Sequence, residues 1–271
     1  MLLAAAVTAM LALPAHAWAD LLSPEAGPSQ NAKDIDSLYK IVLYIGLAVI
    51  GLVWAALFYT LIRFRGRRGR RAPQISGNTP LEIGWTVAAG AIVIVIAIVT
   101  YTFLDDITDP LPSGPESVAE ARGQYADINQ PPPPGKALDI QVSGQQYLWR
   151  YQYPNQAVSF QQMVVPRDTT VVLTLKANDV IHSWWIPELG GKVDAVPGYE
   201  NKTWFKATET GTFEGQCAEL CGISHYAMTA KVTVVEPRVY LAWVENQKRL
   251  IAQARELAVK QREQIQAEAA R

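Results

Sequence analysis

Two long apolar segments without a charged residue constrain this chain more than any other feature of its sequence. They run from Ile41 to Ile62 and from Ile83 to Leu104. As helices that rise about 1.5 Å per residue, each would be about 33 Å long, enough to cross a hydrocarbon core about 30 Å thick. A buried helical hairpin is the alternative, but core helices of water-soluble proteins seldom lack all charge over about six turns. The sequence therefore predicts two transmembrane helices, 41–62 and 83–104.

The segment between the two apolar runs predicts their orientation. Six arginines lie between Arg63 and Arg71, and an excess of basic residues in a short loop places that loop, 63–82, on the cytoplasmic side. Both termini are then expected on the outer face of a bacterial plasma (inner) membrane. An arginine run can also bind nucleic acid, but its position between two spans favours topology. A net charge of −1 and the lack of a nucleic-acid motif give no reason to expect that partner.

The first 19 residues resemble a secretory leader. They are apolar and end in small residues around Ala17 and Ala19, as signal-peptide cleavage sites do. No lysine or arginine precedes the apolar core, which is unusual for a leader. We expect residues 1–19 to be a signal peptide.

Two segments of different composition follow the second apolar run. Residues 105–136 are first acidic and then rich in proline, which is typical of a semi-rigid linker. From residue 137 to 236, short β-rich runs alternate with turn residues, and this pattern predicts an antiparallel sandwich or barrel. The expected strands are Leu138 to Val142, Tyr147 to Tyr153, Met163 to Val165, Thr169 to Leu175, Thr203 to Ala207 and Lys231 to Val235.

The C-terminal tail, 237–271, is charged and helix-prone. Four apolar residues recur in it at seven-residue spacing, namely Val244, Ile251, Ala258 and Ile265. Four positions do not establish a coiled coil, so the sequence predicts only a helix here.

The segment from Cys217 to Met228 concentrates metal-binding side chains. It holds both cysteines of the chain, one of its three histidines and one of its four methionines. Thiolate and thioether sulfur select soft or borderline metals, copper above all, and imidazole is compatible with copper. A further ligand is expected from His182, because the remaining histidine lies in the predicted leader.

Two other interpretations of the cysteines have to be weighed. A disulfide is common in exported domains, but one between Cys217 and Cys221 would close a very small loop and stabilise little. It would also leave His225 and Met228 unexplained. Zinc binds cysteine and histidine well, but zinc sites rarely use methionine and usually contain a second close pair of ligands, which this sequence lacks.

Four motifs resemble subunit II of the haem-copper cytochrome c oxidases, which carries a binuclear copper (CuA) domain. They cover about residues 35–236 and comprise Cys217–Met228, Val180–Pro187, Lys192–Gly198 and Thr79–Thr86. The resemblance implies a two-helix membrane hairpin followed by a Greek-key cupredoxin-like sandwich. It also implies a subunit that takes single electrons from cytochrome c, or a similar outer-side donor, and passes them to haem in catalytic subunit I. There oxygen is reduced and protons are pumped, so the membrane-bound complex with its further subunits is the oxidoreductase.

The resemblance implies a role for each side chain of the copper motif. The sulfurs of Cys217 and Cys221 would bridge two copper ions, and His182 and His225 would each bind one of these ions. The thioether of Met228 would bind weakly, and the main-chain carbonyl of Glu219 would complete the set. Haem is expected only in the partner subunit, since the chain has no Cys-x-x-Cys-His motif.

Three carboxylates receive further roles from the same resemblance. The Glu219 side chain would bind magnesium at the boundary with the catalytic subunit, with Asp194 close to that metal or at the interface. Glu82, just before the second apolar run, would stand at the mouth of a proton pathway. The ordinary alternative is a solvated group, or for Glu82 a side chain that reaches from the membrane boundary to water.

An aromatic segment raises the question of where electrons enter. Tyr147, Trp149, Tyr151 and Tyr153 alternate with other residues, and period two places all four rings on one face of a strand. Core packing alone would explain most of such a stripe. The family usually has His-Gln-Trp-Tyr-Trp here and uses its first tryptophan for electron entry, whereas this chain has Gln-Gln-Tyr-Leu-Trp. Tyr147 and Trp149 are therefore both candidates for electron entry.

Proteins of other classes share parts of this pattern. A copper chaperone or thiol reductase can use Cys-x3-Cys but would normally carry one membrane span. A quinol oxidase subunit has the same architecture without the copper ligands, all of which are present here. The copper domain of nitrous oxide reductase has the motif but follows a large catalytic domain.

Overall fold

The computed structural model describes residues 27–66, 74, 76–111, 113, 137–154 and 156–269. Within them, residues 36–106 form one compact unit, and the segments on either side form a second one. The predicted signal peptide, the arginines at 67–71 and nearly all of the predicted linker lie outside the described residues.

The first unit consists of two long apolar helices, α3 (Gln30–Arg63) and α4 (Thr79–Thr108). Both are long and apolar enough to cross a membrane, and their most apolar windows have no side chains buried within the structure. Such exposure suits helices that face lipid. At the start of α4 the Leu81 amide donates to Asn78 Oδ1 at 3.2 Å, and Glu82 Oε1 accepts from the Asn78 amide at 3.1 Å. This reciprocal cap satisfies two backbone donors at the helix start.

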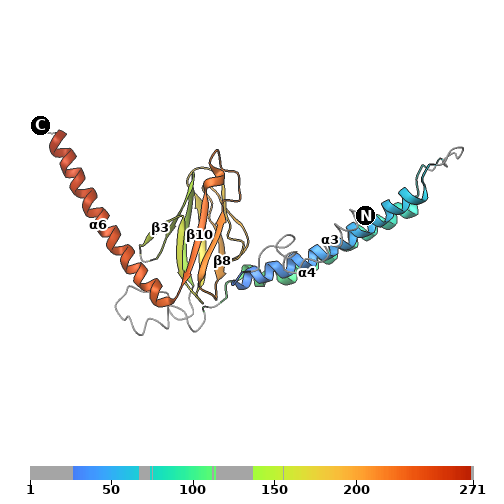
Figure 1. Ribbon diagram of the computed structural model, residues 1–271, viewed down its shortest axis with the longest axis horizontal. Coiled ribbons are helices and arrows are strands. Elements are labelled where there is room, and N and C mark those ends of the chain that lie inside the picture. Colours follow the sequence, from blue (N-terminus) through green and yellow to red (C-terminus); the bar gives the residue numbers. More distant parts are fainter. Residues whose placement is uncertain are drawn as a thin grey trace, which may run out of the picture. The chain divides into compact units, whose positions relative to one another are not determined.

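The second unit is built on two β-sheets and a two-stranded ribbon (Figure 1). The larger sheet has the order β3-β2-β1-β5-β8 and the smaller one the order β4-β10-β9, while β6 pairs with β7. The strands of the larger sheet are β1 (Leu138–Gln145), β2 (Leu148–Gln152), β3 (Val158–Phe160), β5 (Thr170–Ala177) and β8 (Asn201–Lys206). The others are β4 (Gln162–Pro166), β6 (His182–Trp184), β7 (Val193–Ala195), β9 (Gly211–Gln216) and β10 (Thr229–Val235). The predicted sandwich is confirmed.

The pairing is mixed rather than wholly antiparallel, which corrects one expectation. β1 runs parallel to β5 and β10 runs parallel to β4, while the remaining pairs within the sheets are antiparallel. Strand β5 has parallel and antiparallel neighbours, and six of its eight residues are buried. A sequence pattern indicates which face of a strand is buried, but not the direction in which the neighbouring strand runs.

A single apolar core joins the two sheets. Fully buried side chains from the larger sheet, such as Ile140, Trp149 and Leu173, belong to the same cluster as Met163 and Val232 from the smaller one. Alternating residues of β1 and β10 point into this core and to the outside, as period-two strands require.

Helix α6 (Pro237–Ala269) follows β10 and packs on the domain only at its start. Tyr240, Leu241 and Val244 are buried, and the Tyr240 ring stacks with Trp243 at 6.1 Å between centroids. Beyond Val244 none of the helix residues is buried. The predicted C-terminal helix is confirmed, and its later apolar residues lie exposed or half-buried.

Candidate metal centre

Three segments bring the predicted metal ligands to one place. His182 is the first residue of β6, Cys217 follows the last residue of β9, and Met228 precedes the first residue of β10. Because β9 and β10 pair with Gln216 opposite Thr229, the segment 217–228 is closed at its base, where the Cys217 amide donates to the Met228 carbonyl at 2.9 Å. The Ala218 amide donates to the Ser183 carbonyl at 2.9 Å. This second hydrogen bond attaches the ligand loop to β6.

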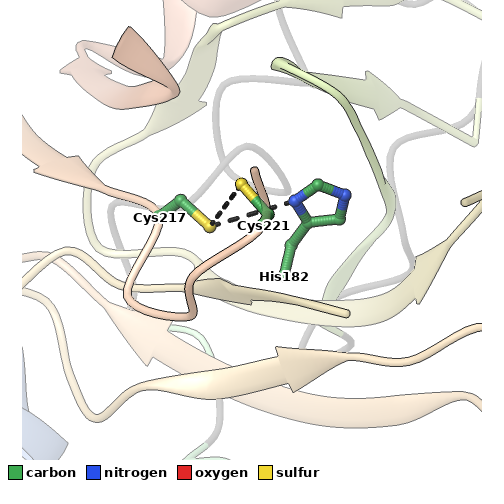
Figure 2. A group of neighbouring side chains, drawn as sticks. All are labelled: His182, Cys217 and Cys221. Carbon is green, nitrogen blue, oxygen red and sulfur yellow. Dashed lines mark hydrogen bonds between the residues drawn. The ribbon is translucent and has the colours of Figure 1, made fainter. Parts of the chain in front are cut away.

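The two thiols and one imidazole face one another (Figure 2). Cys217 Sγ lies 3.9 Å from Cys221 Sγ and 3.9 Å from His182 Nδ1. Ligand atoms of all three residues lie within 4.8 Å of one another. Both cysteines are free, so the disulfide that had to be weighed is not formed.

The remaining expected ligands lie around the two sulfur atoms. His225 Nδ1 is 3.5 Å and Met228 Sδ is 3.9 Å from Cys221 Sγ. The Glu219 carbonyl oxygen is 3.2 Å from Cys217 Sγ. Each sulfur therefore has one imidazole and one weaker donor beside it.

The donor set fits a pair of soft metal ions. A metal–thiolate bond of about 2.3 Å allows one ion to contact both sulfurs, because these are only 3.9 Å apart. Sulfur and imidazole donors together with a thioether favour copper over zinc. His182, Cys217, Cys221 and Met228 are all buried, so water would have little access to a metal bound there.

Burial also affects the protonation of the site. Desolvation, reinforced by the neighbouring Cys217 thiol, raises the pKa of Cys221 to about 11. The Cys221 side chain is therefore a neutral thiol at physiological pH in the protein alone. A bound cation reverses this preference, since a coordinating thiol is deprotonated by the metal charge.

Asp179 holds the histidine of β6, a role that the sequence reasoning missed. Its Oδ1 lies 2.8 Å from His182 Nε2, and its Oδ2 accepts from the Gln146 amide at 2.8 Å. Desolvation alone would raise the pKa of Asp179, but hydrogen bonds from Gln146, His182 and Val180 lower it. The ionised carboxylate fixes the imidazole with Nδ1 turned toward Cys217, the usual arrangement of a carboxylate behind a metal-binding histidine. The three-residue spacing of Asp179 and His182 was the available signal.

The aromatic candidates differ in their surroundings. Trp149 is completely buried, and its ring meets the His182 ring edge-on with 5.9 Å between centroids. Tyr151 and Tyr153 are also buried in the core. Tyr147 lies in the turn before β2, is half-buried, and its hydroxyl accepts from the Ile223 amide at 3.1 Å. A docked protein cannot touch Trp149 directly.

Three carboxylates, those of Glu82, Glu219 and Asp194, were expected to act outside the copper site. Glu82 caps α4, as described above. The side chains of Glu219 and Asp194 are exposed, and neither belongs to a group of three possible metal ligands among the described residues. Asp194 lies in β7, where its carbonyl accepts from the Asn201 side chain at 2.8 Å. Both carboxylates are thus available to a partner.

The fold and the site together define a membrane protein with a cupredoxin-like domain that carries a sulfur- and nitrogen-rich metal site. The model of the cytochrome c oxidase subunit II periplasmic domain matches residues 157–235, and the model of the transmembrane domain of the same subunit matches residues 16–103. The chain therefore belongs to the cytochrome c oxidase subunit II family.

Two relatives agree with this assignment by their sequences. The chain is 32% identical to cytochrome c oxidase subunit 2 of Cereibacter sphaeroides, over 82% of this chain and 78% of that protein. It is 34% identical to the same subunit of Alkalihalophilus pseudofirmus, over 83% of this chain but only 62% of that longer relative. Among solved structures, the periplasmic domain of subunit II from Bradyrhizobium japonicum is 38% identical over 42% of this chain and 96% of that domain, with a TM-score of 0.41.

Proposed function

We propose that this chain is the electron-input subunit of a terminal oxidase, which accepts single electrons from cytochrome c or a similar donor at a binuclear copper centre. The observation that supports this proposal best is the pair of buried thiols 3.9 Å apart, each with an imidazole beside it. A mononuclear site would need only one such set of donors.

The contacts among these side chains support a role for each ligand. Cys217 and Cys221 would hold both ions, His182 and His225 would each bind one, and Met228 Sδ and the Glu219 carbonyl would add weak bonds. Two copper ions held in this way would share one unpaired electron and could take up and release electrons with little change in geometry. The chain buries the two sulfurs away from water. Hydrogen bonds also attach the ligand loop to β6 and close it where β9 ends and β10 begins.

Electrons would reach the centre from the outer side. Tyr147 is half-buried and contacts the ligand loop through its hydroxyl, so it is the more accessible candidate for entry. Trp149 is buried against the His182 ring, and electrons could reach it only through other residues. Between residues 137 and 236 the sequence has ten acidic and seven basic residues, a net charge of −3, which weakly favours a basic donor.

Partner subunits would complete the remaining sites. The exposed carboxylates of Glu219 and Asp194 would share a magnesium ion with catalytic subunit I, where haem would accept the electron. Glu82, at the start of α4, would serve a proton pathway in that subunit. We further propose that the copper domain lies on the outer side of a bacterial inner membrane with both termini outside, and that residues 1–19 form a leader and 63–82 a cytoplasmic loop.

Metal analysis of the full-length chain in detergent tests the proposal. After loading with copper and removal of excess metal, we expect two copper ions per chain, a purple colour and the paramagnetic signal of one electron shared by two ions. One copper ion per chain, or retention of zinc alone by folded protein, would contradict the proposal.

The route by which electrons enter is tested in the assembled oxidase. Replacing Tyr147 by Ala should slow electron transfer from cytochrome c by about tenfold, equal to about 1.4 kcal/mol of barrier, when the rate is expressed per copper-loaded centre. Trp149→Ala gives the comparison for indirect entry through the core. If neither variant slows the reaction, electron entry does not use this aromatic segment.

A further inference from the structure

The turn Gln146–Tyr147 contacts both segments that carry the metal ligands. On one side, the Gln146 amide donates to Asp179 Oδ2 at 2.8 Å, and the other oxygen of this carboxylate holds His182 Nε2 at 2.8 Å. On the other side, Gln146 Nε2 donates to the Cys221 carbonyl at 2.6 Å. The Tyr147 hydroxyl accepts from the Ile223 amide at 3.1 Å. Two adjacent residues therefore connect the His182 segment to the cysteine loop.

Gly222 lies within this contact and shows how closely the turn fits the loop. It has φ of +132°, a conformation that favours glycine. A Cβ atom added there would lie 2.6 Å from Tyr147 Oη and 2.7 Å from Gln146 Nε2. The loop backbone therefore packs directly against both side chains, with no room for a larger residue between them.

We propose that Tyr147 is a positioning residue, whose hydroxyl fixes the backbone of Cys221–Gly222–Ile223 so that Cys221 and His225 are held in place before metal binds. This proposal rests on the proposed copper centre. It concerns the phenol oxygen, and not the ring as a route for electrons. An indole or phenyl ring at this position would present no oxygen to the Ile223 amide.

The Tyr147 hydroxyl contacts Ile223, but it can also affect Cys221 and His225, because the loop is short and has further backbone hydrogen bonds. The His225 amide donates to the Gly222 carbonyl at 3.1 Å, so a fixed Gly222 also limits the movement of His225. Cys221 Sγ lies 3.5 Å from His225 Nδ1 and 3.9 Å from Met228 Sδ. Without the Tyr147 contact, the hydrogen bond from Gln146 Nε2 to the Cys221 carbonyl would be left to connect this turn to the loop.

The test compares Tyr147→Phe with Tyr226→Phe in the full-length chain. Both changes remove one phenol oxygen, but Tyr226 lies on the same loop with 79% of its side chain exposed. In metal-free protein, hydrogen exchange of peptides covering residues 217–228 should be faster by about fivefold in Tyr147→Phe, as expected for the loss of one hydrogen bond. After copper loading, a chelator should remove copper faster by a similar factor, and the visible absorption bands should shift. Tyr226→Phe should match the unmodified chain in all three measurements.

Tyr147→Trp provides a second variant that keeps a large ring and lacks the acceptor, and it should behave as Tyr147→Phe does. Unchanged loop exchange in metal-free Tyr147→Phe or Tyr147→Trp would overturn the proposal, as would copper loss no faster than in Tyr226→Phe. If the unmodified chain takes up no copper at all, the proposed function fails. The exchange measurement on metal-free protein still decides whether Tyr147 fixes the loop.

Discussion

The addition of one methyl group at Gly144 should disturb the metal centre. It lies in β1 directly beneath the His182 ring, and a Cβ atom added there would be 2.9 Å from His182 Cδ2 and 3.1 Å from Trp149. Ordinary contacts at such positions begin at 3.4 Å, so the imidazole would have to move by about half an ångström. His182 is completely buried and bonded to Asp179, and therefore has no free space into which it can move.

Gly144→Ala should change both the free energy of unfolding and the affinity for copper. Overpacking of a filled core costs about 1–3 kcal/mol of unfolding free energy. Metal–ligand distances tolerate only about 0.2 Å, so the shift should also weaken copper binding by at least about tenfold. Competition with a chelator and denaturant unfolding of the full-length chain measure the two effects. Gly211→Ala is the control, because its nearest neighbour is the Phe213 ring at 3.3 Å. Unchanged copper affinity in Gly144→Ala would refute the assigned position of His182 as a ligand.

Three other changes have defined outcomes. Asp179→Asn should lower copper affinity by about tenfold or more, because the histidine it contacts loses a charged partner; equal affinity in a titration would show that the carboxylate is dispensable. Cys217→Ser and Cys221→Ser should each abolish the signal of the shared electron, since either removes a bridge, and a surviving signal would exclude two bridging sulfurs. A reporter active only on the outer side should work when fused after Glu236 and fail after Arg71, and the reverse pattern would overturn the orientation.

Local features of the sequence predicted most of the side chains that gather around the two thiols, and contacts between distant segments could not be predicted. The apolar runs and the spacing from Cys217 to Met228 are local, so length and donor chemistry were enough to interpret them. His182 was found by elimination among three histidines. The contact of Tyr147 with Ile223 spans 76 positions and depends on how β2 meets the cysteine loop. No periodicity in the sequence carries that information.

The connections among the ligand segments bear on how such a site transfers electrons. An ion that is held by loops alone would allow its ligands to move between redox states, and each movement would add to the barrier. Here the loop is tied at its base by the amide of Cys217, to β6 by the amide of Ala218, and to the Gln146–Tyr147 turn at its tip. These contacts accompany a separation of 3.9 Å between the two sulfurs. These hydrogen bonds therefore restrict the geometry of the loop, and a bound metal would have to adapt to it.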